Sequence, residues 1–290
     1  MKYYNNYELT YRKLYAEKKQ DQKHDLKQDQ QNSYEFIEKI FSMPMFRHLN
    51  NIHNNDNIPY DVLIIGIGIG DLGFWMAAKG FNVWGIDVSA TAIDIANQRS
   101  LAYDYDFRQR LSFLNMDVTS FSIDSNRKCN RKFDLIIDNH CLHCLVDDED
   151  RRSYYQQVRN HLKEEAALVI ETMVYEDNFI VNKSTKSTKS TKSTNSAESA
   201  DENYILDDNR TLWQKTNIKE YSNIVKHNGH DYIPVRKILD VYQIEQEFLK
   251  CNYKIKYFVF RSDLRIKLDE YQADNLTCNN LPPVLRAVLY

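Results

Sequence analysis

Short apolar runs alternate with helix-length segments through the middle of the chain. Five runs rich in β-branched and aromatic residues are typical of buried strands, and they lie at 61–65, 81–87, 111–117, 133–138 and 167–173. Helical patterns stand between them at 74–79, at 90–100 after the candidate N-cap Ser89, and at 147–163. Strands that alternate with helices predict a parallel sheet with helices on both faces.

The C-terminal part of the chain breaks this alternation. A helical pattern at 235–250 is followed by two further strand patterns, at 253–262 and 284–290. No helix-length apolar pattern separates these two strands, so we expect them to pair antiparallel. The sequence therefore predicts seven strands in an α/β fold that is mostly parallel, with an antiparallel last strand.

Two other segments differ from this pattern. Residues 1–57 form a polar, partly helical extension, whose apolar helical pattern at 34–49 we expect to end or kink at Pro44. Its tyrosines, with Arg47 and His48, are candidates for a lid over a ligand. We assign residues 58–290 to the sheet-forming domain, which carries a Lys-Ser-Thr repeat insertion at about 182–200. That repeat has almost no apolar residue and cannot pack a core.

Composition excludes several classes of protein. The chain has 290 residues, enough to bury a sizeable core. Its formal net charge of −3 argues against a protein that grips a nucleic-acid backbone. We see no apolar run long enough to span a membrane and no secretory signal. Five cysteines, an odd count in a long chain, favour a reducing, cytoplasmic setting over a disulfide scaffold.

Glycine is scarce but concentrated. Six of the seven glycines lie between positions 66 and 85. Gly66, Gly68 and Gly70 directly follow a strand and open a helix, where the backbone can approach a ligand and the helix N-terminus favours its negative group. Asp87 ends the next strand, and an acidic side chain there can accept hydrogen bonds from both hydroxyls of a ribose. The pair predicts an adenosine-containing ligand at the carboxyl ends of the strands.

The glycine loop also satisfies the dinucleotide pattern G-x-G-x-x-G between Gly68 and Gly73, so an NAD(P)-dependent oxidoreductase stays an alternative. Two features argue against it. Asp117 ends the third strand pattern, where its carboxylate could accept a bond from an adenine amino group. The chain also closes with the two paired strands rather than with a further catalytic domain.

Four stretches together resemble a known family. They are DVLIIGIGIGDLG, FNVWGIDVSATAIDIANQR, LSFLNMDVTSF and FDLIIDNHCLHCL, followed by a helix and ALVIETM, and they span about residues 58–175. Their order and spacing resemble class I S-adenosylmethionine-dependent methyltransferases. The resemblance implies a Rossmann-like, doubly wound seven-stranded sheet with the strand order three-two-one-four-five-seven-six.

The resemblance also implies a role for each position of the cofactor site. The methionine and ribose of S-adenosylmethionine would lie on the loop Gly66, Ile67, Gly68 and Gly70. Its ribose hydroxyls and adenine would be bound by Asp87, Val88, Asp117 and Val118. Its sulfonium and methyl would lie beside Asp138 and Asn139. Ile64 departs from the family, which often has an acidic residue there to hold the amino group of the cofactor.

The segment after the fourth strand carries the candidate catalytic groups. His140 first, and then His143, are candidates for a general base or an acceptor-positioning group, because histidine titrates near neutrality. The plainer alternative is that both only shape the loop or cap a helix. Cys141 and Cys144 also invite a zinc site, but neighbouring residues cannot surround one ion tetrahedrally. We therefore expect no metal.

These observations predict an S-adenosylmethionine-dependent methyltransferase that acts on oxygen, nitrogen or sulfur of a small molecule. The acidic net charge, and the lack of an Asn-Pro-Pro-Tyr motif after the fourth strand, make a nucleic-acid substrate unlikely on sequence grounds. No membrane partner is expected. Besides the oxidoreductase, a non-catalytic methyltransferase-like binding module stays an alternative, because Ile64 replaces the usual acidic residue.

Overall fold

The structure is a computed structural model that describes residues 2–16, 23–43, 46, 49, 60–121, 131–175, 203–260 and 284–290. Arg47 and His48, Pro44, the repeat insertion at 182–200 and the last two residues of the predicted strand 253–262 lie outside these ranges.

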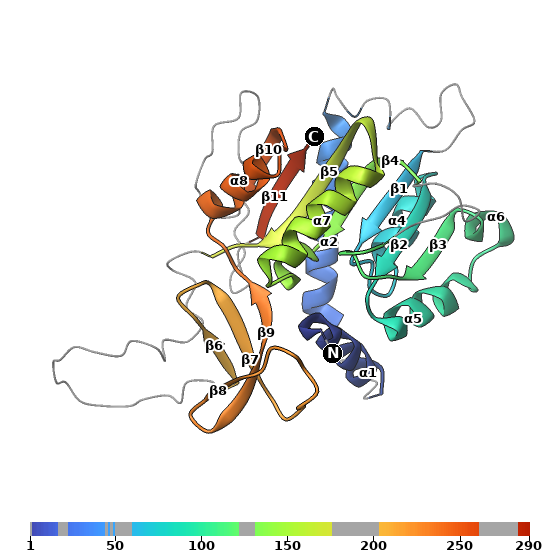
Figure 1. The fold of residues 1–290 in the computed structure, drawn as a ribbon. Helices are drawn as coiled ribbons and strands as arrows, with labels where there is room; N and C mark the ends of the chain where they lie inside the picture. The colour runs from blue at the N-terminus through green and yellow to red at the C-terminus, as the bar shows by residue number, and fades with distance from the viewer. Residues whose placement is uncertain are drawn as a thin grey trace.

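A seven-stranded sheet forms the centre of the protein (Figure 1), with the strand order β10-β11-β5-β4-β1-β2-β3. The strands are β1 Asp61–Ile65, β2 Asn82–Asp87, β3 Leu111–Asn115, β4 Phe133–Asn139, β5 Leu162–Met173, β10 Ile255–Phe260 and β11 Val284–Leu289. β11 runs antiparallel to both of its neighbours, β10 and β5, and the other neighbouring strands pair in parallel. The predicted fold class and strand order are therefore confirmed.

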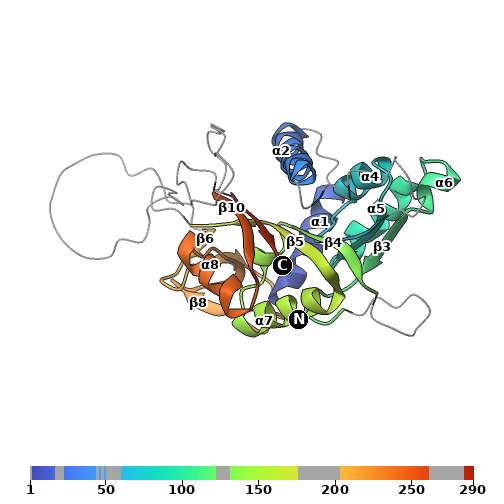
Figure 2. The same ribbon diagram turned by 90° about the horizontal axis from the view of Figure 1, so that it is seen from above.

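Helices cover both faces of this sheet, as Figure 2 shows from above. One face packs on α2 Lys23–Ser42, α4 Asp71–Ala78 and α5 Ala90–Ser100, and the other on α7 Asp148–His161 and α8 Val241–Lys250. A short helix, α6 Tyr105–Arg108, precedes β3. Ile64 faces the α2 side and Leu63 the α7 side, and both are fully buried. Central strands covered on both faces explain the unbroken apolar runs of the sequence.

A second, four-stranded antiparallel sheet was not predicted. It has the order β6-β7-β9-β8, and its strands are β6 Tyr204–Leu206, β7 Thr211–Thr216, β8 Val225–His227 and β9 His230–Lys237. The predicted helix at 235–250 is wrong in its first turns, because β9 continues to Lys237. The helix begins at Val241, where Asp240 and Gln243 form a capping box.

The N-terminal segment lies across the carboxyl ends of the parallel strands. It consists of η1 Tyr3–Asn5 and α1 Asn6–Ala16 and lies below the central sheet in Figure 1, between that edge and the small sheet. The short turn η3 Leu142–Cys144 follows β4 at the same edge and packs on β9. None of the helices in the described ranges is long and apolar enough to cross a membrane.

Candidate functional site

The loop between β1 and α4 presents its backbone at the edge of the sheet. Gly66, Gly68 and Gly70 all have positive φ, at 70°, 55° and 93°. Residues with a side chain are strained in this region of backbone conformation. A Cβ at Gly68 would lie only 2.7 Å from the hydroxyl of Tyr11. Ile67 turns its side chain into the core over Gly85. The loop therefore offers backbone groups, and not the Ile67 side chain, to a ligand.

Asp87 joins this loop to the end of β2. Its Oδ2 accepts the Gly68 N–H at 2.9 Å, and its Oδ1 accepts the Ser89 N–H at 2.9 Å. Burial raises the pKa of Asp87, and these backbone donors oppose the shift. Each carboxylate oxygen has a further lone pair, which can accept a hydroxyl. Val88, the next residue, packs half-buried against the core.

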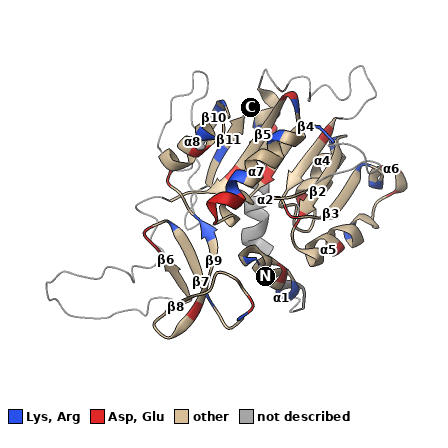
Figure 3. Cartoon of the chain, viewed as in Figure 1, with Lys and Arg blue, Asp and Glu red and all other residues tan. Residues whose placement is uncertain are grey.

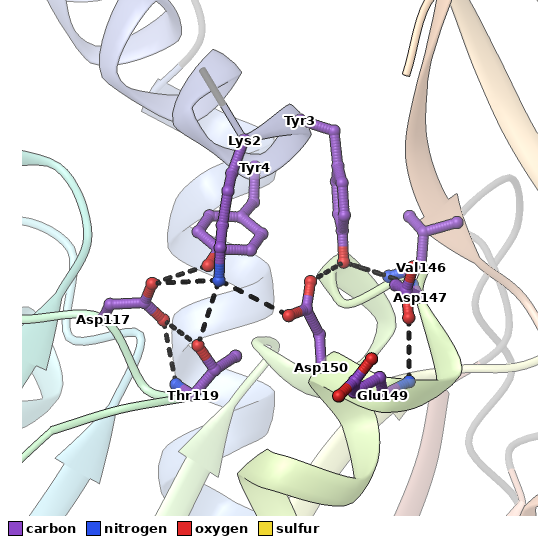
Figure 4. A network of polar contacts seen from close by, with 9 residues as sticks. All are labelled: Lys2, Tyr3, Tyr4, Asp117, Thr119, Val146, Asp147, Glu149 and Asp150. Carbon is purple, nitrogen blue, oxygen red and sulfur yellow. Dashed lines mark hydrogen bonds and ion pairs between the residues drawn. The ribbon is translucent and has the colours of Figure 1, made fainter. Parts of the chain in front are cut away.

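Asp117 lies just beyond β3 rather than closing it. It accepts the Tyr4 hydroxyl at 2.6 Å, the Thr119 N–H at 2.9 Å and the Thr119 hydroxyl at 2.7 Å (Figure 4). Burial alone would raise the pKa of Asp117, but these hydrogen bonds outweigh burial and lower it. Val118 buries its side chain in the core.

The carboxylate of Asp138 accepts hydrogen bonds from neighbouring groups of the protein itself. It is fully buried at the end of β4, where its Oδ1 accepts the N–H groups of Cys141 at 2.8 Å and Leu142 at 3.3 Å. The Tyr154 hydroxyl donates to its Oδ2 at 2.7 Å. Burial raises the pKa of Asp138 to about 6. Asp138 therefore shapes the turn that carries the two candidate histidines.

Asn139 and His140 come next at this edge. The Asn139 amide donates to the Gly66 carbonyl at 3.4 Å, which places it directly beside the glycine loop. His140 has a left-handed backbone, with φ of 63°, and its N–H donates to the Glu171 carbonyl at 3.1 Å. This conformation costs a non-glycine residue roughly 1–2 kcal/mol, and such strain gathers at functional sites.

His143 has a different environment, although its ring lies 5.9 Å from that of His140. It is buried, and its Nδ1 accepts the Met173 N–H at 3.2 Å. A neutral ring in this position carries its proton on Nε2. Burial, and then the charge of Arg236, lower the pKa of His143 well below its ordinary value. This geometry favours positioning over proton abstraction for His143.

Residues of η1 and α1 reach this site: the tyrosines of this segment were predicted only as a lid, and Glu8 was not predicted at all. Glu8 accepts the Ser89 hydroxyl at 2.7 Å and the Thr91 hydroxyl at 2.6 Å, at the N-terminus of α5. The Tyr4 hydroxyl donates to Asp117, and the Tyr11 hydroxyl lies beside Gly68. A signal was present, because Tyr4, Tyr7 and Tyr11 follow a helical i, i+3, i+7 spacing.

Among the described residues, no three histidine, cysteine or acidic side chains gather as metal ligands. Cys141 and Cys144 are free thiols beside the two histidines. Burial raises the pKa of Cys144 to about 11 and that of Cys141 well above its ordinary value. Both thiols are therefore protonated near neutral pH.

Comparisons with known proteins fit this arrangement. A family model described as a methyltransferase domain matches residues 63–168, from β1 to β5. A solved S-adenosylmethionine-dependent methyltransferase from Methanosarcina mazei has the same fold, with a TM-score of 0.51 at 16% identity, covering 82% of this chain and 95% of that one.

Residues 63–168 therefore resemble a methyltransferase domain.

The chain is also similar to two further solved structures. The glycopeptide N-methyltransferase MtfA, complexed with S-adenosylmethionine, has a TM-score of 0.47 at 14% identity, covering 81% of this chain and 88% of that one. A methyltransferase from Clostridium acetobutylicum has a TM-score of 0.47 at 18% identity, covering 89% and 98%. No curated protein sequence matches the chain.

Proposed function

We propose that the protein binds S-adenosylmethionine at the edge built by Gly68, Asp87 and Asn139, and transfers the methyl group to a small-molecule acceptor. One contact carries this proposal. The bond from the Gly68 N–H to Asp87 Oδ2, at 2.9 Å, joins the left-handed glycine loop to the carboxylate at the end of the neighbouring strand. A backbone cradle beside a carboxylate is the arrangement that an adenosine ligand needs.

The residues present fit this cofactor. A Cβ at Gly66 would crowd the Asn139 carbonyl at 3.1 Å, and the positive φ of Gly66 would strain any side chain there. Asp87 would hold the ribose hydroxyls, Asp117 the adenine, and Asn139 would lie beside the transferred group. When bound, the cofactor supplies an electrophilic methyl group on a positively charged sulfur. Ile64 is fully buried in the core, so another group has to hold the amino end of the cofactor.

The work left to the protein is alignment and, where the acceptor carries a proton, removal of that proton. Alignment and exclusion of water supply much of the rate of such a displacement. His140 is half-buried at the end of β4, where it can act as the base or position the acceptor. The net charge of −3 supports a small molecule over a nucleic acid as acceptor.

Calorimetric titration tests the cofactor. We expect S-adenosylmethionine and S-adenosylhomocysteine to bind the wild type, and Asp87→Asn to weaken both by at least about tenfold. Asp94→Asn is the matched control, because it removes the same charge from an exposed position of α5. Circular dichroism checks that both variants fold.

Three results would contradict the proposal. Binding of NADH alone would favour the oxidoreductase. Cofactor binding without formation of S-adenosylhomocysteine on any tested acceptor would favour a binding module. Equal affinities for the two asparagine variants would remove Asp87 from the site.

A further inference from the structure

Arg236, near the end of β9, has no carboxylate partner among the residues that the structure describes. Its Nε is buried and has no hydrogen-bond partner, and it forms no ion pair with any carboxylate in the described ranges. The buried Arg151 differs in this respect. Its guanidinium donates to both carboxylate oxygens of Glu247 at 2.8 Å, and to two backbone carbonyls. Buried charges in proteins are normally paired and hydrogen-bonded as Arg151 is.

The strand that carries Arg236 has a register shift just before this residue. The pairing of β9 with β7 shifts register at Val235, because Leu212 faces Arg236 while Trp213 faces Pro234. Such a bulge re-aims side chains and is frequent beside active sites. The Tyr7 hydroxyl donates to the Val235 carbonyl at 3.1 Å, which ties α1 to the bulge. β9 also packs on η1 and on η3, the turn that carries His143.

The groups around Arg236 are neutral. Burial raises the pKa of Tyr7 well above its ordinary value, and the charge of Arg236 opposes this shift without reversing it. The same holds for Cys144, whose pKa burial raises to about 11. Burial lowers the pKa of His143, and the charges of Arg236 and His140 lower it further. The Arg236 guanidinium and the His140 ring therefore both lie within electrostatic reach of the His143 imidazole. The groups that act most strongly on Arg236 are the phenols of Tyr7 and Tyr204 and the thiol of Cys144.

We propose that Arg236 is the anion-binding group of the acceptor site, and that the methyl acceptor carries a carboxylate or another oxyanion. The proposal rests on the proposed function and names the acceptor class for the same site. A guanidinium presents parallel N–H donors that match two oxygens of one oxyanion. An acceptor held there by its anionic end lies near His140. The cofactor also has a carboxylate, so the test separates these two sources.

The first arm detects anion binding in the full chain. The Arg236 Nε–H resonance of the ¹⁵N-labelled protein is assigned by its loss in Arg236→Lys, and is then followed during titration with acetate and, for comparison, chloride. We expect a saturable shift with acetate only. Lys237→Gln, the neighbouring charge on β9, should leave the shift unchanged. A resonance that responds equally to both salts, or to neither, would overturn the anion site.

The second arm separates acceptor from cofactor. S-adenosylhomocysteine formation is measured on a panel of small carboxylic acids, each paired with its amide. We expect turnover to favour the acids and Arg236→Gln to raise their KM at least about tenfold, with Arg236→Lys between the two. Lys237→Gln should match the wild type, and the affinity of Arg236→Gln for S-adenosylmethionine should not change.

The remaining outcomes distinguish the two proposals. If Arg236→Gln loses affinity for S-adenosylmethionine, Arg236 holds the carboxylate of the cofactor and the acceptor assignment is wrong, while the proposed function stands. Equal turnover of acids and amides also overturns the acceptor assignment alone. If the wild type binds acetate at Arg236 but no sulfur nucleoside, the proposed function fails and the acceptor assignment fails with it.

Discussion

The phenol of Tyr4 donates a 2.6 Å hydrogen bond to the carboxylate of Asp117. The bond belongs to a network that ties the N-terminal segment to two parts of the sheet edge (Figure 4). The Tyr3 hydroxyl accepts the Val146 N–H at 2.8 Å and donates to Asp150 at 3.0 Å, at the N-terminus of α7. Acidic residues gather at that end of α7 (Figure 3), where the helix dipole favours them. The segment thus bridges the end of β3 and the start of α7.

Tyr4→Phe should lower stability in a pH-dependent way. The pKa of Asp117 is lowered in the fold, so its stabilisation is present above the ordinary value of 3.8 and lost as pH falls through the lower value of the folded state. We expect a loss of about 1–2 kcal/mol at pH 7 that shrinks below pH ~4. Thermal unfolding across pH measures this difference.

The control for Tyr4 is Tyr105→Phe, which removes a hydroxyl from a side chain that is 65% exposed. It should be neutral at every pH. A loss for Tyr4→Phe that is the same at pH 3 and pH 7 would show that Asp117 is not the partner that matters.

Glu8→Gln should release α1 from α5. Burial would raise the pKa of Glu8, but hydrogen bonds from Thr91 and Ser89 outweigh it and lower the pKa to about 2. This stabilisation is therefore present above the ordinary value of 4.5 and lost as pH falls toward 2. We expect lower amide-exchange protection factors, which correct for the intrinsic rate at each pH, in residues 6–16 of the variant at pH 7 and in the same residues of the wild type near pH 2. Glu164→Gln, an exposed position, is the control.

Two substitutions at Asp138 should differ sharply in their effect on the stability of the fold. In Asp138→Asn the amide oxygen can still accept the Cys141 N–H, while its nitrogen donates to Tyr154, so the fold should persist. Asp138→Ala leaves the Cys141 and Leu142 N–H groups without an acceptor, at about 1–3 kcal/mol each. Denaturant unfolding of both variants tests this order, and equal stabilities would contradict the assigned bonds.

The stability of the wild type should also depend on the protonation state of Asp138. Burial raises its pKa from 3.8 to about 6, so the stability it contributes is present below pH 3.8 and lost as pH rises through about 6. Asp138→Asn does not titrate there. The stability of the wild type relative to Asp138→Asn should therefore fall by about 3 kcal/mol between pH 3.8 and 7. A flat difference across this window would place the titration elsewhere.

His140→Asn separates the imidazole from the backbone conformation. Asparagine tolerates the left-handed region, where His140 has φ of 63°, so stability should change little. If His140 is the base, kcat should fall at least about 100-fold, measured as S-adenosylhomocysteine formation on an acceptor from the carboxylic-acid panel. The exposed His227→Asn is the control. An unchanged kcat would leave His140 a positioning or structural role.

His143→Gln should lower stability rather than kcat, the opposite of His140→Asn. Its amide oxygen can accept the Met173 N–H, and no proton transfer is expected from this buried ring. We therefore expect a lower melting temperature with kcat close to that of the wild type. A large fall in kcat with unchanged stability would make His143 the base instead.

Local pattern was enough for the central fold and for the strand-end edge that carries the candidate site. The apolar runs predicted all seven central strands to within a few residues, except that β5 begins five residues earlier, at Leu162. The glycine loop and Asp87 were found because both lie at the carboxyl end of a strand, and parallel strands end at one edge. The small sheet was missed because its strands are short and half-exposed, and because Pro234 and the register shift at Val235 break their alternation.

By itself, the sequence determined the doubly wound fold, the glycine loop with the carboxylate of Asp87 at the end of the next strand, and the segment that carries His140 and His143. Periodicity and glycine placement are local, so one chain displays them. Only the tertiary structure decided how these groups are used. It buried His143 against the Met173 N–H, and brought Tyr4 to Asp117 and Arg236 to Tyr7 and Cys144. Residues so distant along the chain meet only through packing, and packing sets which charges find partners.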